Sequence, residues 1–440
     1  TQSSRGFCWY TKEDCDSAVL IMKNGVDISA SLQFDDSCEK WEGYYMHKVT
    51  ASGLSADTTY TYKVGDGKTW SDVGTFTTDD GDSNVNILVY ADVQASSLNN
   101  FLVGARAVNA GLNSSAAPFD FMINLGDFTN DSTNEEWNLY DEAFKKINKN
   151  ITLAPVAGNH DGLGVWHWFD NMFNLDTSES VQTLNGVNYS FDYGNAHFAV
   201  INTNDMYPMT QSQRNWLVND MSKTDADWKI VLMHRASYSE GKNINKPDAI
   251  IMRDVLIPLF DELDIDVVEA GHDHVYYRSK QVKGDKVVDN VQYVTEMFNG
   301  EETTFALNPE GSVHIVPATA GTKRYRVYDA IDPIPGCCDF RLSTRDLGGC
   351  FMTTEIDGGK LVMKSYLVDD KTQEITLIDK YAIKKDVGQN KPAEDYQELP
   401  TDNVSNISAY ITNFVKAIVD MLVKYLFVLL PKVIKNAFKK

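Results

Sequence analysis

The sequence predicts an α/β protein with a small all-β domain in front of it and an amphipathic helix behind it. Residues 1–78 contain short alternating stretches broken by Gly and Asp turns, which is typical of a small β-sandwich. From residue 84 the pattern changes to apolar runs of strand length separated by helix-like segments, which indicates a largely buried sheet covered by helices. A chain of 440 residues, 43% of them hydrophobic, can bury such a core without a partner.

The predicted domain boundaries follow from changes in composition. Residues 1–78 form the small β-sandwich and residues 84–385 the main domain. Residues 389–403 are polar with two prolines and are interpreted as a linker. Residues 404–440 form the helix, which is apolar on one face, basic around it and too charged to span a bilayer. Three interpretations of this helix stay open: contact with a membrane surface, self-association, and packing against the body of the same chain.

The charge balance bears on the partners of the protein. The chain has 40 Lys and Arg against 62 Asp and Glu, a formal net charge of −22. Such a protein is not attracted as a whole to a phosphate backbone, so we expect no nucleic acid partner.

Cysteines and sequons point to an exported protein. Six cysteines form two groups of three, and we interpret them as a disulfide framework, with reduced core thiols as the alternative. The N-x-S/T sequons begin at Asn113, Asn130, Asn150, Asn188, Asn403 and Asn406. Together with a first residue that is not Met, these features predict a secreted glycoprotein, extracellular or in an endomembrane, lysosome-like compartment.

Five apolar strands end abruptly in side chains that bind metals. The carboxyl ends of strands in an open α/β sheet gather at one crevice, so these side chains are expected to converge. The candidate ligands are Asp92, Asp127, Asn159, His234, His272 and His274, with Gln94 as a further candidate. Carboxylate, amide and imidazole donors without thiolate suit Fe, Mn or Zn. Seven donors suffice for two metal ions if one carboxylate bridges them.

The order and spelling of these segments resemble the calcineurin-like metallophosphoesterase superfamily. Within it the chain is similar to purple acid phosphatases that carry a fibronectin-III-like domain in front, through residues 53–64, 74–78 and 189–198. The resemblance covers roughly residues 5–385 and implies an αββα sandwich with a dinuclear metal centre. It implies a bridging Asp127, a first metal on Asp92 and His274, and a second metal on Asn159, His234 and His272.

The resemblance also implies a function. The chain is expected to be a dinuclear metal-dependent phosphohydrolase, in first place a phosphomonoesterase similar to acid phosphatases, which uses a metal-bound hydroxide on phosphorylated small molecules or phosphoproteins. His160 is expected to assist the leaving group, with a structural histidine as the alternative. Arg235 and Arg278 are candidate phosphate contacts, with surface ion pairing as the alternative. A phosphodiesterase or nucleotidase, and a surface adhesion or scaffold protein with a vestigial metal site, are the two rival functions.

Two positions depart from the family's pattern. The purple enzymes spell the second motif Gly-Asp-x-x-Tyr, and their tyrosinate binds ferric iron, whereas this chain has Asn130 at that position. We therefore expect a protein that is not purple and has a weaker preference for Fe(III). Gln94 stands where the superfamily more often has His. It either binds the first metal through its amide oxygen or hydrogen-bonds a metal-bound water.

Overall fold

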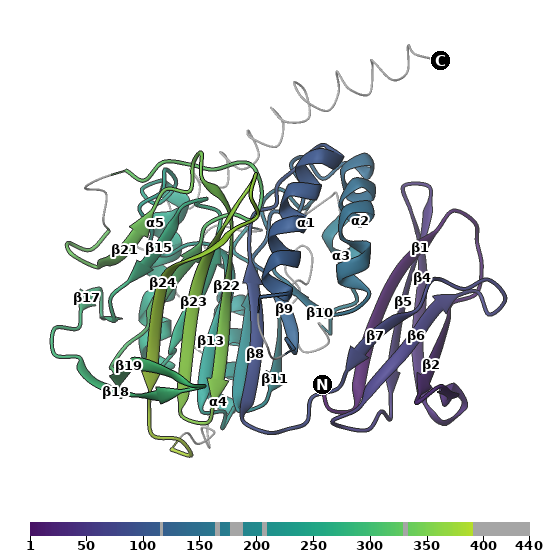
Figure 1. Cartoon of the computed structure of the whole chain (residues 1–440), viewed down its shortest axis with the longest axis horizontal. Coiled ribbons are helices and arrows are strands. Elements are labelled where there is room, and N and C mark those ends of the chain that lie inside the picture. The colour runs from purple at the N-terminus through teal and green to yellow at the C-terminus, as the bar shows by residue number, and fades with distance from the viewer. Residues whose placement is uncertain (115–117, 163–167, 177–187, 205–208, 329–332, 390–440) are drawn as a thin grey trace, which may run out of the picture.

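The computed structural model describes residues 1–114, 118–162, 168–176, 188–204, 209–328 and 333–389, as a β-sandwich beside a larger α/β domain (Figure 1). The predicted helix over 404–440, nearly all of the linker over 389–403 and the sequons at Asn403 and Asn406 lie outside the described residues. Within the described ranges, no helix combines the length and apolar character needed to cross a membrane.

The N-terminal region forms a sandwich of two antiparallel sheets. Its elements are β1 (Ser4–Thr11), β2 (Ala18–Lys23), β3 (Val26–Asp27), the short 3-10 helix η1 (Ser29–Ser31), β4 (Gln33–Trp41), β5 (Tyr44–Ser52), β6 (Thr59–Gly65) and β7 (Gly74–Thr77). The strand orders are β1-β5-β4 and β3-β2-β6-β7. Alternation along the strands buries Ile21, Val49, Tyr60 and Phe76 in a core of their own.

The main domain begins with β8 and contains two large sheets. The first has the order β10-β9-β8-β22-β23-β24-β19-β18. Its strands are β8 (Asn84–Tyr90), β9 (Phe121–Asn124), β10 (Thr152–Pro155), β18 (Gln292–Phe298), β19 (Glu301–Leu307), β22 (Gly348–Asp357), β23 (Lys360–Asp369) and β24 (Ile375–Lys384). The strands β8, β9 and β10 are parallel, so their carboxyl ends lie at the same edge.

The second sheet has the order β11-β12-β13-β14-β20-β15-β21. Its strands are β11 (Tyr189–Tyr193), β12 (Ala196–Ile201), β13 (Trp228–Arg235), β14 (Val267–Gly271), β15 (Tyr276–Ser279), β20 (Val313–Pro317) and β21 (Cys338–Leu342). A two-stranded ribbon pairs β16 (Val282–Lys283) with β17 (Lys286–Val287). The strands β12, β13, β14 and β20 are parallel.

Helices cover the outer face of each sheet. They are α1 (Leu98–Leu112), α2 (Asn134–Asn148), α3 (Trp168–Met172), α4 (Gln211–Lys223) and α5 (Pro247–Glu262). Capping boxes start α2 at Thr133 and α4 at Thr210, which satisfies amide groups that would otherwise lack a partner. Side chains of α1 and α2 share a core with the first sheet, and those of α4 and α5 share one with the second.

The layer order is helix, sheet, sheet, helix. On β8, Ile87 and Val89 belong to the core between the two sheets, which also contains Phe198 and Leu232 of the second sheet. The intervening Leu88 belongs instead to the core beneath α1 and α2, as the two-residue period of a strand requires. The predicted αββα architecture with a β domain in front is confirmed.

The β-sandwich packs against the α1 and α2 side of the main domain through polar contacts. The Tyr62 hydroxyl donates a hydrogen bond to the Lys149 carbonyl oxygen (3.1 Å), and the Tyr10 hydroxyl donates one to Asp141 (3.3 Å). A cavity of about 1270 Å³ lies between the two domains and is lined by neither the carboxylates nor the imidazoles predicted to bind metal.

The structure contains no disulfide between any two of the six cysteines, so it does not show the predicted disulfide framework. Cys8, Cys15 and Cys38 lie in the β-sandwich region, whereas the other three belong to β21, β22 and the turn before β21. Cys350 is buried in the core between the two sheets, and Cys337 is buried in the core that the second sheet shares with α4 and α5. The alternative reading as reduced core thiols describes these two residues.

His197 on β12 is an ionised histidine that stabilises the fold away from the predicted metal ligands. Its Nδ1 lies 2.7 Å from Asp192 and its Nε2 lies 2.9 Å from Asp220. Burial opposes the positive charge, but the hydrogen bonds and charges of the two carboxylates outweigh it and raise the pKa of His197 to about 9. A pKa above that of the unfolded chain means that protonation favours the folded state.

The stability contributed by His197 is expected to be complete below about pH 6.5 and to decline as the pH rises to about 9. Because Asp192 is exposed, we expect a loss of about 2 kcal/mol of unfolding free energy, less than the full shift would give. Denaturant unfolding at about pH 6.5 and about pH 9 should show that His197→Gln is more destabilising at the lower pH. His314→Gln is the control, because burial lowers the pKa of His314 to about 3 and keeps it neutral throughout. An equal His197→Gln effect at both pH values would contradict the expectation.

Candidate metal centre

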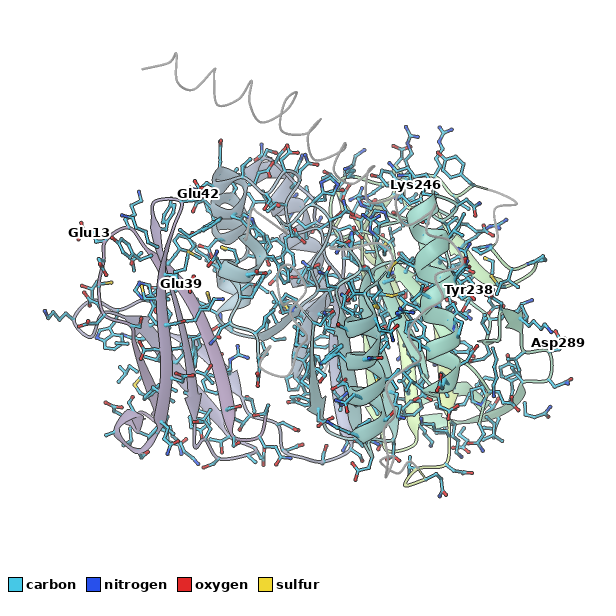
Figure 2. All side chains as sticks on the ribbon, turned by 180° about the vertical axis from the view of Figure 1, so that it is seen from behind. Glu13, Glu39, Glu42, Tyr238, Lys246 and Asp289 are labelled. Carbon is cyan, nitrogen blue, oxygen red and sulfur yellow. The ribbon has the colours of Figure 1, made fainter. Side chains whose placement is uncertain are left out.

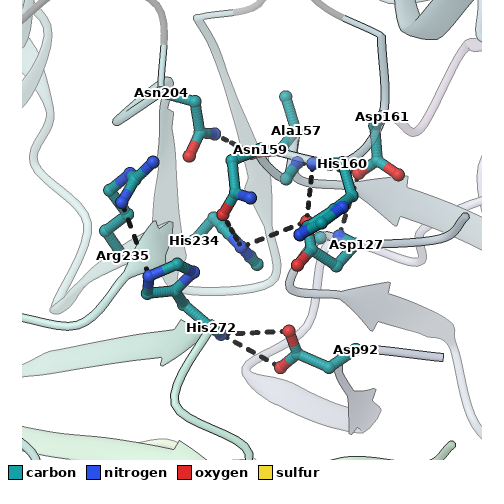
Figure 3. A network of polar contacts seen from close by, with 12 residues as sticks. Asp92, Asp127, Ala157, Asn159, His160, Asp161, Asn204, His234, Arg235 and His272 are labelled. Carbon is teal, nitrogen blue, oxygen red and sulfur yellow. Dashed lines mark hydrogen bonds and ion pairs between the residues drawn. The ribbon is translucent and has the colours of Figure 1, made fainter. Parts of the chain in front are cut away.

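The predicted ligands lie at the carboxyl ends of five strands. Asp92 and Gln94 follow β8, Asp127 follows β9, Asn159 follows β10, His234 lies near the end of β13, and His272 and His274 follow β14. Since β8, β9 and β10 are parallel and β13 and β14 are parallel, these ends meet at one edge between the two sheets. Figure 3 shows this meeting of side chains from both sheets.

The backbone turns sharply directly after the strands. The φ angle is +54° at Asp92, +36° at Gln94, +53° at Asp127 and +71° at His272. Residues other than glycine seldom adopt this left-handed conformation, which costs about 1 to 3 kcal/mol each. Such strain persists where the surroundings hold it and is concentrated at functional sites.

Two glycines allow the loops after β9 and β10 to approach each other. A Cβ atom on Gly158 would lie 2.0 Å from the Asp127 backbone nitrogen, and one on Gly126 would lie 2.5 Å from Nδ1 of His234. Neither contact is sterically possible, and at Gly126 the φ angle of +97° also favours glycine. The close approach of carboxylate and imidazole therefore depends on both glycines.

The side chains form two potential ligand groups that share one carboxylate. One group consists of Asp127, His234 and His272, and the other of Asp92, Asp127 and His274, with ligand atoms within 4.8 Å of one another in each group. The amide oxygen of Asn159 lies 3.2 Å from Nε2 of His234. Asp127 thus stands where a carboxylate that bridges two ions would stand.

The hydrogen bonds of the histidines suit metal binding. Nδ1 of His234 donates to the Leu125 carbonyl oxygen (2.8 Å), and Nδ1 of His274 donates to the carbonyl oxygen of Lys323. In each case Nε2 faces a carboxylate, 3.3 Å from Asp127 and 3.2 Å from Asp92 respectively, and is the ring atom that a metal ion would contact. A second hydrogen bond of this kind is the usual support of a metal-binding imidazole.

Gln94 supplies a buried oxygen without a hydrogen-bond donor. Its backbone N–H donates to the Asp127 carbonyl oxygen (2.8 Å), which ties the loop after β8 to the loop after β9. Its side-chain Oε1 is buried and accepts no hydrogen bond within the described residues. An orphaned oxygen beside carboxylates and imidazoles fits a cation or a cation-bound water, the two roles predicted for Gln94. The donor set as a whole therefore fits two ions bound by nitrogen and oxygen.

The charge states of Asp127 and His272 suit metal binding. Burial opposes the charge on Asp127, but the imidazoles of His234 and His160 outweigh it and hold its pKa well below the usual range. Burial and the neighbouring Arg235 lower the pKa of His272 well below its usual value, so this ring is neutral. Burial opposes the charge on His234, but Asp127 outweighs it and raises the pKa of His234 to about 9. The carboxylate anion and the neutral imidazole are the forms that bind metal ions, so metal binding has to release the proton of His234.

Asp161 is a residue whose role the sequence analysis did not assign. Its carboxylate accepts hydrogen bonds from four backbone amides, those of Gly158 (2.8 Å), Asp127 (2.9 Å), Phe128 (2.7 Å) and Thr129 (3.2 Å). These amides come from the loops after β9 and β10, so one side chain holds the two loops together. The sequence feature that could have revealed this role is the position of Asp161 as the fourth residue of the segment Gly-Asn-His-Asp.

His160 lies against Asp127 without belonging to either ligand group (Figure 3). Its backbone N–H donates to Asp127 Oδ1 (2.9 Å), and its Nδ1 lies 2.5 Å from the carbonyl oxygen of Asn130. That carbonyl accepts a hydrogen bond and therefore keeps a proton on Nδ1. The ring is thus oriented beside the shared carboxylate by the backbone of Asn130.

The two predicted arginine contacts differ in their surroundings. Nη1 of Arg235 lies 3.4 Å from Nε2 of His272, at the rim of the ligand groups. Arg278 on β15 instead pairs with Asp379 (2.6 Å) and Asp339 and stacks over Tyr381. Its guanidinium serves the protein's own ion pairs, so no contact in the structure supports a phosphate-binding role for Arg278.

Two protein-family models match separate parts of this chain. Residues 85–276 match the model of the calcineurin-like phosphoesterases, and residues 1–78 match that of the purple acid phosphatase N-terminal domain. The chain is 28% identical to an uncharacterized protein of Mycobacterium tuberculosis over 190 residues, which cover 39% of this chain and 35% of that protein. It is 22% identical to acid phosphatase type 7 of Danio rerio, over 76% of this chain and 79% of that protein. The chain thus spans only about a third of the mycobacterial relative.

Solved structures show the same fold. The purple acid phosphatase from yellow lupin seeds superposes with a TM-score of 0.68 at 15% identity, over 92% of this chain and 76% of that one. The structure of PhoD superposes with a TM-score of 0.57 at 12% identity, over 86% of each chain. At these identities the likeness concerns the fold, and the site has to be judged from its own residues.

Proposed function

Because the chain combines a calcineurin-like phosphoesterase domain with a purple acid phosphatase N-terminal domain, we propose that it is a metal-dependent phosphatase acting on phosphate monoesters. The observation that carries the proposal is the pair of ligand groups joined at Asp127. Two metal ions held side by side are the arrangement that serves displacement at phosphorus. Phosphorylated small molecules and phosphoproteins are the proposed substrates.

We propose that Asp127 bridges the two ions, that Asp92 and His274 bind the first, and that Asn159, His234 and His272 bind the second. Gln94 supports the first position through its otherwise unpartnered oxygen. When bound, two such ions activate water, orient the phosphoryl group and neutralise its developing charge. The residues themselves hold this positive centre inside an acidic protein and so create a local attraction for an anionic substrate.

Arg235 and His160 flank the ligands and have different proposed roles. Arg235, within 3.4 Å of His272, is positioned to pair with a phosphate oxygen. The Asn130 carbonyl orients His160 through Nδ1, so that Nε2 of its imidazolium form is the atom that stabilises or protonates the leaving-group oxygen.

The test of the function is hydrolysis of an aryl phosphate monoester and the matching diester between about pH 4 and 9, after chelation and after addition of Fe, Mn or Zn. Turnover of the monoester that is lost on chelation and restored by metal is expected. Preferential turnover of the diester would favour a phosphodiesterase. Absence of turnover with every metal would reject the enzyme and favour the scaffold protein.

Replacing His160 by Ala is expected to keep both metal ions and to lower kcat by about a hundredfold or more, because the leaving group loses its acid. Metal content and steady-state kinetics on esters of increasing leaving-group acidity provide the measurement. The defect should shrink as the leaving group becomes more acidic. A variant that loses metal, or a defect that is the same for all leaving groups, would support the structural reading of His160.

We also propose an extracellular or endomembrane location for the protein. The side chains of Asn113 and Asn150, which begin two of the sequons, are exposed in the folded chain and are available to carry glycans. Asn188 is different, because its side chain is buried and accepts a hydrogen bond from the Asn202 backbone (2.7 Å).

A further inference from the structure

A segment that none of the five motifs includes lies directly against the candidate metal centre. The hydroxyl of Thr319 donates to the Asp92 carbonyl oxygen (2.6 Å), and Gly321 packs so closely on the Val93 backbone that a Cβ would lie 2.2 Å from its oxygen. Further along, the Tyr325 ring stacks on His274 with centroids 4.4 Å apart and planes 12° apart. Residues 319–325 are therefore fixed to both the first and the last ligand loop.

This segment brings Lys323 to the site. The Lys323 carbonyl oxygen accepts the hydrogen bond from Nδ1 of His274. Burial lowers the pKa of its ammonium group, while Asp127 and Asp92 act in the opposite direction, so the charge lies within electrostatic reach of both carboxylates.

Two further lysines gather around the same point. Nζ of Lys242 lies 3.8 Å from the centre of the Tyr325 ring, which is the ring stacked on His274. Lys246 precedes α5 and lies at its amino end (Figure 2). Burial lowers the pKa of Lys242, and the charges of Lys246 and Lys323 add to this effect, whereas Asp273 opposes it.

The carboxylates that act on these lysines are Asp127, Asp92 and Asp131 at Lys323 and Asp273 at Lys242, and none of them is a direct ion-pair partner. Within the described parts of the chain, no carboxylate forms an ion pair with Lys242, Lys246 or Lys323. Arg324, the neighbour of Lys323, shows the contrast because it makes two hydrogen bonds to Asp370 (2.6 and 2.9 Å). In a chain with a net charge of −22, three adjacent lysines without a paired carboxylate offer a site for an external anion, most of all when bound metal ions offset the charge of Asp92 and Asp127.

We propose that Lys242, Lys246 and Lys323 bind a second anionic group of the substrate, carried by the leaving group of the ester that the metal centre cleaves. The inference rests on the proposed phosphatase function. Preferred substrates are phosphate monoesters whose alcohol bears another phosphate or a carboxylate. Arg235 and the metal ligands face the scissile phosphate, whereas the lysines lie beyond Tyr325 on the His274 side of the centre, where an attached second anion would extend.

The test compares three matched esters with the metal-loaded protein: phenyl phosphate, 4-carboxyphenyl phosphate and benzene-1,4-diyl bisphosphate. The quantity of interest is kcat/KM for each anionic ester divided by that for phenyl phosphate, with the bisphosphate corrected for its two equivalent groups. Lys323→Gln and Lys242→Gln are each expected to lower this ratio about fivefold, mainly through KM. The ratio should also fall as salt is added, because the lysines are partly exposed.

Two control variants separate binding from structure. Lys323→Arg keeps the charge and should restore the ratio. Lys283→Gln removes an exposed lysine that pairs with Glu310 on the β16 ribbon, and it should leave the ratio unchanged. A ratio that is the same in the wild type, Lys323→Gln and Lys242→Gln would overturn the proposal. If the wild type fails to hydrolyse phenyl phosphate with any metal, the phosphatase function itself is rejected, and the lysine proposal falls with it.

Discussion

Replacing Asp127 by Asn is expected to remove both metal ions and to lower phosphatase turnover at least about a thousandfold. Asp127 is the carboxylate common to the two ligand groups, so its loss affects both positions at once. An amide offers one neutral oxygen in place of a charged pair and cannot bridge two cations equally well. Metal content by elemental analysis and kcat for an aryl phosphate provide the measurement.

A partly buried aspartate elsewhere serves as the control for this variant. Asp266 pairs with Lys385 (2.7 Å) beyond the other end of the strands, and Asp266→Asn should lower stability but keep metal and turnover. If Asp127→Asn retains two ions per chain, the bridging role is wrong. If it loses only one ion, the two ligand groups do not depend on a shared carboxylate.

The second large effect is expected at Asp161. Replacing it by Ala leaves four buried backbone N–H groups without an acceptor, and we expect the unfolding free energy to fall by about 3 to 6 kcal/mol. The loops after β9 and β10 should also separate, which is expected to weaken metal affinity about ten- to a hundredfold. Denaturant unfolding of the metal-free chain and metal titration measure the two effects separately.

Asp161→Asn provides a milder version in case the alanine variant does not fold. The amide keeps one acceptor oxygen, but its NH₂ group faces N–H donors, so about half of the defect should remain. Asp261→Ala is the matched control, because that carboxylate accepts one hydrogen bond from the Gly284 backbone (2.6 Å) on the surface. A stability loss at Asp161 no larger than that at Asp261 would show that the carboxylate does not hold the loops.

The sequence predicted the fold class because its strongest signals are local. Alternation along residues 4–77 reflects strands with one buried face, and the apolar runs after residue 84 reflect strands covered on both faces. The order of the metal-binding motifs could also be predicted, since each motif follows its own strand. The sequence around each motif does not show which of the two ions each ligand binds. This assignment stays a prediction that metal analysis has to test.

Some expectations failed or found no support because they depended on distances between remote segments. Six cysteines in two groups resemble a framework in sequence, but the fold separates the groups into different domains. Arg278 lies close to the ligands along the chain, yet β15 directs its guanidinium to Asp379 of β24. Neither result could be obtained from spacing.

The sequence by itself therefore determined the layers, the β domain in front of them and the five strand ends that carry carboxylate, amide and imidazole groups. These depend on hydrophobic periodicity and on the alternation of side chains within single strands. Only the tertiary structure decided that Asp161 would tie two loops together and that residues 319–325 would bring Lys323 beside His274. Both depend on hydrogen bonds between segments far apart in the chain, and periodicity within one segment carries no information about such contacts.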